Sequence, residues 1–241
     1  DPGRLNFALY KNIPENVKKV EERNPAILFK CVKNPTEVEN IRIAEIKDSV
    51  AHVRFMKWLK ENVGKETITE MSASDKLDEF RAEMGGFIRP SFGPISAFGE
   101  HSAIVHYSSS PETNVELHEG TFLMTDTGAG FYEGSTDITR TYAFGEVSQI
   151  MKDHFTLVAI SNLNLASPIF KKGCCGMNFD YLARKPFWDR GLDFNHGTGH
   201  GVGYLLNIHE GPAGFRYTYR AGESDAFQPG MVIKDEPGIY I

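Results

Sequence analysis

The 241-residue sequence lacks any apolar run long enough to cross a membrane. Its longest unbroken apolar stretches are short, for example Phe7–Tyr10 and Ala26–Phe29, whereas a spanning helix needs about 20 apolar residues. No charged segment followed by an apolar stretch resembles a secretory signal. We therefore expect neither a signal peptide nor a membrane partner.

Positive charge and cysteine are also scarce. The 26 Lys and Arg residues are outnumbered by 32 Asp and Glu residues, which gives a formal charge of −6. This mild acidity argues against a nucleic-acid partner, because phosphate backbones are bound by clustered positive charge. The cysteines are only Cys31, Cys174 and Cys175, an odd number with two adjacent, so a disulfide framework is not expected. A reducing cytoplasm is the simplest location.

Several familiar site motifs are absent. The sequence has no G-x-x-x-x-G-K phosphate loop and no G-x-S-x-G nucleophile elbow. Four glycines alternate between Gly197 and Gly203, but not at the dinucleotide-binding spacing. His209-Glu210 is not followed by a second histidine three residues later, so the helical zinc-protease motif is missing as well.

Helices and strands are expected in separate blocks after residue 36. Apolar residues at helical spacing predict a long helix over 36–59, and Ser72–Asp75 matches a capping box for a second helix. Two further helices are predicted over 149–167 and 178–189, strands over 103–107, 121–125 and 136–144, and a loop over 87–99. Helices and antiparallel strands in blocks indicate the α+β class.

The first 35 residues are expected to be the tail of a preceding domain. Residues 5–9 and 26–29 have strand-like patterns, with a short helix predicted between them over 14–23. Three such small pieces cannot bury a core of their own. The predicted main domain therefore covers residues 36–241.

Two carboxylates flank a glycine turn in the β-rich part of this domain. Asp126 ends one predicted strand, and Asp137 begins the returning strand. Antiparallel pairing would bring the two side chains close together, and such a pair either shares a proton or holds a cation. An isolated Asp at a turn is ordinary, but Asp137 lies in the β-rich stretch Thr-Asp-Ile-Thr-Arg-Thr, where Asp is disfavoured. This favours a functional site.

Three histidines follow within a glycine-rich segment. His196 and His200 have helical spacing, but each intervening glycine would cost a helix about 1 kcal/mol. An extended backbone that approaches another segment closely fits better. Together with His209, these residues predict a ligand or proton-transfer cluster.

The third acidic segment is Asp235-Glu236-Pro237-Gly238, which alone would be an ordinary turn. Combined with the earlier residues it completes a set of three carboxylates and one imidazole: Asp126, Asp137, His200 and Glu236. Such donors suit Mn, Co, Fe or Zn in a two-metal hydrolytic centre. A structural zinc knot is not expected, because no thiolate belongs to the set.

The order and spacing of these segments resemble the metallopeptidases with the "pita-bread" fold, and among them the Xaa-Pro aminopeptidases (aminopeptidase P). The motifs that carry the resemblance are Asp126 with Asp137-Ile-Thr-Arg-Thr, His196-Gly-Thr-Gly-His200-Gly-Val-Gly, His209-Glu-Gly-Pro and Glu236-Pro-Gly. The resemblance covers about residues 36–241.

The resemblance implies a role for each matching residue. Asp126, Asp137, His200 and Glu236 would bind two divalent ions, usually manganese, with Asp137 bridging them. His106 would lie on the substrate side, and Glu236 could also accept a proton. His209 would contact the scissile peptide, and His196 would line the same pocket.

The implied activity is hydrolysis of the bond between an N-terminal residue and a following proline, so peptides with proline second are the expected substrates. Relatives often dimerise through this domain, so a homodimer is one expected state. The family has a fifth ligand, a second bridging glutamate, on a strand after the Glu236-Pro-Gly segment, and this sequence stops at Ile241. We therefore expect a truncated catalytic domain that lacks its C-terminal strands and is impaired or metal-poor.

Three alternatives stay open at this point. A prolidase acting on Xaa-Pro dipeptides would have the same fold. A non-catalytic binding module on this fold would carry no stoichiometric metal, although the retained ligands argue against it. A structural protein with coincidental acidic residues would tolerate the loss of Asp137.

Overall fold

The computed structural model describes all 241 residues, and its longest element is helix α3 (Pro35–Asn62). Asn34 caps this helix in a capping box with Glu37, and Pro35 occupies the first turn. Apolar residues at helical spacing, among them Phe55 and Leu59, are buried along one face. The predicted long helix is confirmed.

Helix α4 (Glu70–Glu83) packs against α3, and it begins earlier than the Ser72–Asp75 motif predicts. The capping residue is Thr69, whose side chain accepts a hydrogen bond from the backbone N–H of Ser72. Ser72 therefore lies in the first turn of the helix, at the other end of the capping box.

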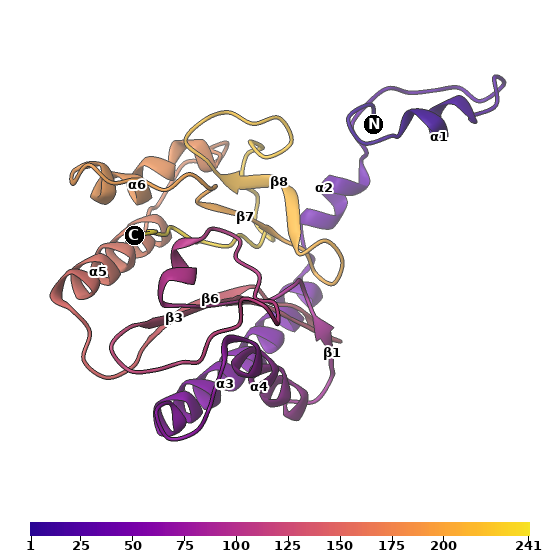
Figure 1. The fold of residues 1–241 in the computed structure, drawn as a ribbon. Helices are drawn as coiled ribbons and strands as arrows, with labels where there is room; N and C mark the ends of the chain where they lie inside the picture. Colours follow the sequence, from indigo (N-terminus) through magenta and orange to yellow (C-terminus); the bar gives the residue numbers. More distant parts are fainter.

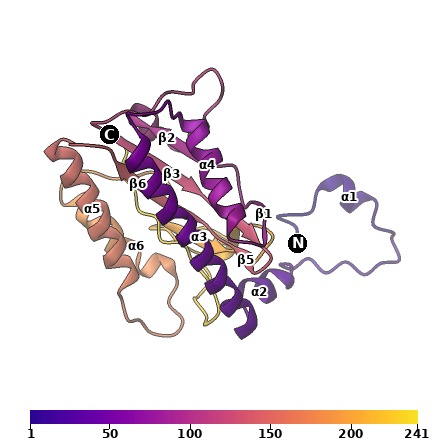
Figure 2. The same cartoon turned by 90° about the horizontal axis from the view of Figure 1, so that it is seen from below.

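The central antiparallel sheet has the order β2-β3-β6, formed by β2 (Ile95–Phe98), β3 (Phe122–Thr127) and β6 (Ile138–Ala143). Helices α3 and α4 cover one face of it (Figure 2). Leu123 and Tyr142 point from the sheet into the main apolar core, where they meet Phe55 and Leu77 of the two helices. A second, smaller sheet has the order β1-β4-β5. It consists of β1 (Phe87–Pro90), β4 (Ala129–Phe131) and β5 (Gly134–Ser135).

A buried ion pair joins the two helices to this sheet. The Arg81 guanidinium of α4 donates to both carboxylate oxygens of Asp48 on α3, over 2.8 and 3.1 Å, and to Thr127 Oγ1 over 2.9 Å. Thr136 also donates to Asp48. Both charged side chains are almost fully buried, so each needs the other.

The second half of the chain packs its own helix pair against a two-stranded ribbon (Figure 1). Helices α5 (Gln149–Ala166) and α6 (Asp180–Trp188) contact each other, and the ribbon consists of β7 (Gly199–Val202) and β8 (His209–Phe215). Single-turn helices η1 (Gly99–Ala103) and η2 (Gly176–Asn178) complete the elements of the domain. The α+β class is confirmed, with helices and antiparallel strands in both halves.

The secondary-structure predictions for the N-terminal segment are wrong. The chain forms short helices α1 (Phe7–Lys11) and α2 (Ala26–Cys31) where strands are predicted, and no helix over 14–23. Phe7, Leu9 and Phe29 are mostly exposed, so no partner strand or core selects an extended backbone there. Figure 1 shows α1 projecting away from the rest of the molecule.

Two further local predictions are wrong. Residues 87–99 contain β1 and β2 instead of a loop, because β4 and β3 supply pairing partners from elsewhere in the chain. The predicted strand at 103–107 is instead the end of η1 and a turn in which His106 has a φ of 59°. No helix combines the length and the apolar character that a bilayer span requires.

Candidate metal centre

The two predicted carboxylates lie on neighbouring strands. Asp126 is on β3 opposite Thr139 of β6, and Asp137 directly precedes β6. Thr139 Oγ1 donates to Asp126 Oδ1 over 2.7 Å. The Asp137 carboxylate is fully buried, whereas that of Asp126 is partly exposed.

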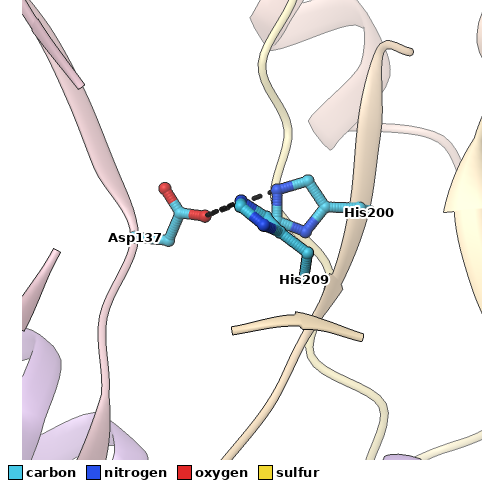
Figure 3. A group of neighbouring side chains, drawn as sticks. All are labelled: Asp137, His200 and His209. Atoms are coloured by element: carbon cyan, nitrogen blue, oxygen red, sulfur yellow. Dashed lines mark ion pairs between the residues drawn. The ribbon is translucent and has the colours of Figure 1, made fainter. Parts of the chain in front are cut away.

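Two imidazoles approach Asp137 from the β7-β8 ribbon. His200 Nε2 lies 3.3 Å from Asp137 Oδ2, and His209 Nε2 lies 3.9 Å from the same oxygen. The two rings meet edge to face with centroids 4.6 Å apart. One donor atom from each of the three residues lies within 4.8 Å of the others, an arrangement that can hold a metal ion (Figure 3).

The chain around Lys234 and Glu236 runs beside β7. The Lys234 N–H donates to the His200 carbonyl over 2.8 Å, and the Glu236 N–H donates to the Thr198 carbonyl over 2.9 Å. A side chain at Gly199 would have its Cβ 2.0 Å from the Lys234 carbonyl oxygen, so this close approach requires glycine. The alternating glycines thus belong to an extended strand, as the sequence predicts.

Lys234 lies at the centre of the acidic residues. Its Nζ is 2.8 Å from Asp126 Oδ1 and 2.9 Å from Glu236 Oε2, and it also contacts Asp137 Oδ1. The other oxygen of Glu236 is 3.5 Å from His200 Nε2. The structure therefore brings the four predicted groups together, with an ammonium among them.

His196 and His106 occupy the outer part of the same cleft. His196 Nδ1 lies 2.8 Å from the Gly197 carbonyl and so carries the proton, which leaves Nε2 to accept from the Tyr240 hydroxyl over 2.9 Å. His106 is exposed and makes no hydrogen bond to the acidic cluster. Of the predicted site residues, His196 and His106 are thus the two without a hydrogen bond or ion pair to the acidic cluster.

A buried arginine holds the backbone that carries His196. Arg184 of α6 pairs with Asp180 over 2.7 Å and donates to the His196 carbonyl over 2.9 Å. It also donates to the Phe194 carbonyl over 2.6 Å. The guanidinium thus fixes the backbone segment that leads into β7.

Burial and charge act against each other at these groups. Burial alone would raise the pKa of Asp137, but the neighbouring His200 imidazole and the charge of Lys234 hold that pKa below its usual value. Burial lowers the pKa of Lys234, yet the charges of Asp126, Asp137 and Glu236 outweigh it and raise that pKa. Burial also lowers the pKa of His209, and the neighbouring His200 adds to this effect.

The donor set fits a divalent metal. Asp137 Oδ2 is buried and has no hydrogen-bond donor, although it faces His200 and His209. A buried anionic oxygen without a partner is costly, and a cation between it and the imidazoles would satisfy it. Carboxylate oxygens with imidazole nitrogen suit Zn and the divalent transition ions.

Lys234 is not among the residues that the sequence motifs predict for the site. A usable signal was present, because Lys234 and Glu236 are two residues apart in an extended segment and so point to the same side. The β-like run Met231–Lys234 alone could not reveal that this side faces Asp126 and Asp137.

The chain is similar to known metallopeptidases. Residues 39–241 match the model of metallopeptidase family M24. Across 240 residues the chain is 38% identical to a probable Xaa-Pro aminopeptidase P of Botryotinia fuckeliana, covering 99% of this chain and 36% of that protein. It is 36% identical to human Xaa-Pro aminopeptidase 2, covering 97% of this chain and 34% of that protein. The chain thus spans little more than a third of the length of these relatives.

Solved structures agree. An X-prolyl aminopeptidase of Caenorhabditis elegans, described as a cytosolic enzyme with a di-nuclear active site, has 35% identity and a TM-score of 0.84, covering 90% of this chain and 35% of that one. A Xaa-Pro dipeptidase of Bacillus anthracis has 29% identity and a TM-score of 0.84, covering 100% of this chain and 64% of that one. The predicted pita-bread fold and the predicted family are confirmed, and the chain belongs to metallopeptidase family M24.

Proposed function

We propose that this chain carries the catalytic centre of a metal-dependent Xaa-Pro aminopeptidase. The observation that carries the proposal is the convergence of Asp126, Asp137, His200 and Glu236, together with the buried Asp137 Oδ2, which has no hydrogen-bond donor. The similarity to Xaa-Pro aminopeptidases over nearly the whole chain supports the substrate class. On this proposal, residues 36–241 belong to the catalytic domain and 1–35 to the end of a preceding one.

The four converging residues would hold divalent ions, and Asp137 would serve as a ligand through both of its oxygens, which face different groups. Manganese is the proposed metal, with cobalt, zinc and iron as the other candidates for this donor set. When bound, such ions supply a nucleophilic water at neutral pH and polarise the scissile carbonyl. Glu236, which is partly exposed, would also accept a proton from the attacking water.

The histidines would act on the substrate. His209 is 61% exposed in its side chain and lies beside His200, so its neutral imidazole can donate a hydrogen bond to the carbonyl oxygen as negative charge develops there. His196, held by Tyr240 and Gly197, would line the pocket. His106 would contact substrate from the outer side of the cleft.

A prolidase acting on dipeptides is the second candidate, because the B. anthracis dipeptidase is as close in fold as the aminopeptidase. We further propose that the protein acts in the cytoplasm, which suits its three free cysteines and the cytosolic C. elegans neighbour. Self-association into a homodimer belongs to the same proposal.

Cleavage of matched peptides by the intact Mn²⁺-loaded protein tests the function. A tripeptide with proline second should be cleaved at least about 100-fold faster, in kcat/KM, than the same peptide with alanine second or than the Xaa-Pro dipeptide. A preference for the dipeptide would select the prolidase alternative. Stoichiometric metal without cleavage of any peptide would refute the proposal.

Asp137→Asn supplies the matched control for this assay. The amide has the same shape but no charge, so metal affinity should fall by more than about 100-fold and cleavage should be lost. Asp225→Asn, a change in a partly exposed ion pair with Arg23, should leave both unchanged. Isothermal titration with Mn²⁺ and the peptide assay would measure the two effects. Full cleavage by Asp137→Asn would support the structural alternative.

A further inference from the structure

The carboxylates of the centre divide their oxygens between two positions. Asp137 presents Oδ1 to the Lys234 ammonium and Oδ2 to the imidazoles of His200 and His209. Glu236 does the same, with Oε2 on Lys234 Nζ at 2.9 Å and Oε1 3.5 Å from His200 Nε2. Two cation positions therefore lie side by side, and the ammonium fills the one that Asp126 completes.

We propose that Lys234 is a built-in competitor for one of the two metal positions, so that the centre loads its ions in two unequal steps. This inference rests on the proposed metal centre. The first ion binds at the imidazole side, where Asp137 Oδ2 has no other partner. The second ion binds only by displacing the ammonium from Asp126, Asp137 and Glu236.

Steric reasoning supports this exclusion. A divalent ion bound to carboxylate oxygens sits about 2.0 to 2.2 Å from them. The Lys234 nitrogen already lies 2.8 Å from Asp126 Oδ1 and 2.9 Å from Glu236 Oε2. Both cations cannot share that space, so one must leave.

Charge favours the same order of loading. Three carboxylates and one ammonium leave a charge of −2, which one divalent ion neutralises. The first ion thus meets an uncompensated site, whereas the second competes with a cation that is already paired. Lys234 cannot withdraw easily, because its side chain is 7% exposed and its backbone is hydrogen-bonded to β7.

Titration of the intact protein with Mn²⁺ tests the proposal. Calorimetry measures the affinity of each step, and electron paramagnetic resonance detects the pair of ions. In the wild-type protein the second ion should bind at least about tenfold more weakly than the first, and a spin-coupled two-manganese signal should need excess metal. Lys234→Met removes the charge but keeps the apolar stem. It should tighten the second step at least about tenfold and produce the coupled signal at two equivalents.

Two variants act as controls. Lys234→Arg keeps a cation and should retain the two unequal steps. Lys185→Met removes a lysine from an exposed ion pair on α6 and should behave like the wild type.

Each outcome bears on a separate claim. Two equal ions in the wild type, or no tightening in Lys234→Met, would overturn the role of Lys234 and leave the proposed function intact. Absence of metal from the wild type and both Lys234 variants would overturn the metal centre itself. If Lys234→Met fails to fold, the wild-type titration and Lys234→Arg still decide between equal and unequal steps.

Discussion

At the scale of single residues, the buried His52 makes the stability of the folded protein depend on pH. Its Nδ1 lies 2.9 Å from the Tyr142 hydroxyl, and its Nε2 lies 3.4 Å from the Arg81 guanidinium, so the ring is held neutral. Burial lowers the pKa of His52 to about 4, with Arg81 adding to the effect and Asp48 opposing it. The unfolded chain would have a histidine pKa of about 6.5.

The sign of the pH effect follows from these two values. Below about pH 6.5 the unfolded chain binds a proton at His52 that the folded protein does not take up until about pH 4, so stability falls as the pH falls through this window. We predict a loss of about 2 kcal/mol from this group between pH 7.5 and 4.5. Urea unfolding of the wild type and His52→Gln at both pH values measures it.

The His52→Gln variant lacks the titrating imidazole but keeps all the other titrating groups. The difference in stability between the wild type and this variant therefore isolates the contribution of His52. His52→Gln should be less stable than the wild type at pH 7.5, and this gap should narrow by that amount at pH 4.5. A gap that stays constant with pH would show that His52 is not held neutral.

At the scale of elements, the Asp48–Arg81 pair joins α3, α4 and the central sheet. Arg81→Met would leave the Asp48 charge buried with only hydroxyl and imidazole neighbours, because its direct cation is gone. We predict a loss of about 3 to 5 kcal/mol in the free energy of unfolding, measured by urea denaturation.

A second arginine on the same helix pair is the matched control. Arg54 of α3 pairs with Glu83 of α4, but both side chains are more than a third exposed. Arg54→Met should therefore cost no more than about 1 kcal/mol. Equal losses in the two variants would contradict the importance of burial for this pair.

The elements also show what local sequence patterns can predict. α3 and α5 follow from apolar spacing that continues over several turns, and α3 adds a proline and a cap at its start. β1 and β2 escape prediction because their partners, β4 and β3, are more than 20 residues away in the chain. Residues 5–9 alternate like a strand, but exposure of Phe7 and Leu9 removes the burial that gives alternation its meaning.

The site shows the same limit. Asp126, Asp137, His200 and Glu236 could be selected because their motifs are distinctive in residue type and order. The place of Lys234 depends on the pairing of its segment with β7, which brings it opposite Asp126, 108 positions away in the chain. Such pairing is a tertiary event that no local pattern encodes.

At the scale of the whole molecule, the N-terminal segment divides into a mostly exposed part and a part that forms ion pairs with β8. Residues up to Arg23 are mostly exposed, and both terminal guanidinium nitrogens of Arg23 donate to Oδ2 of Asp225. In contrast, Lys30 and Lys33 both bind the buried carboxylate of Glu210, next to His209 on β8. The stretch that carries Lys30 and Lys33, just before the predicted boundary at residue 35, is therefore attached to β8.

Two deletions separate these parts. Removing residues 1–22 should lower Tm by less than about 3 °C, because little buried surface is lost. Removing residues 1–33 takes both lysines from Glu210 and should lower Tm by more than about 6 °C. Differential scanning fluorimetry measures both, and similar shifts for the two deletions would show that residues 23–33 contribute little to stability.

The donors of the centre are translated at different times. Asp126 and Asp137 are translated before α5, whereas Lys234 and Glu236 come near residue 241, with the imidazoles of β7 and β8 between. At about 5 to 20 residues per second, Glu236 leaves the ribosome several seconds after Asp137. A nascent chain in that interval has Asp126 and Asp137 but not yet Glu236, so the full set of donors exists only once the segment around Glu236 has been made.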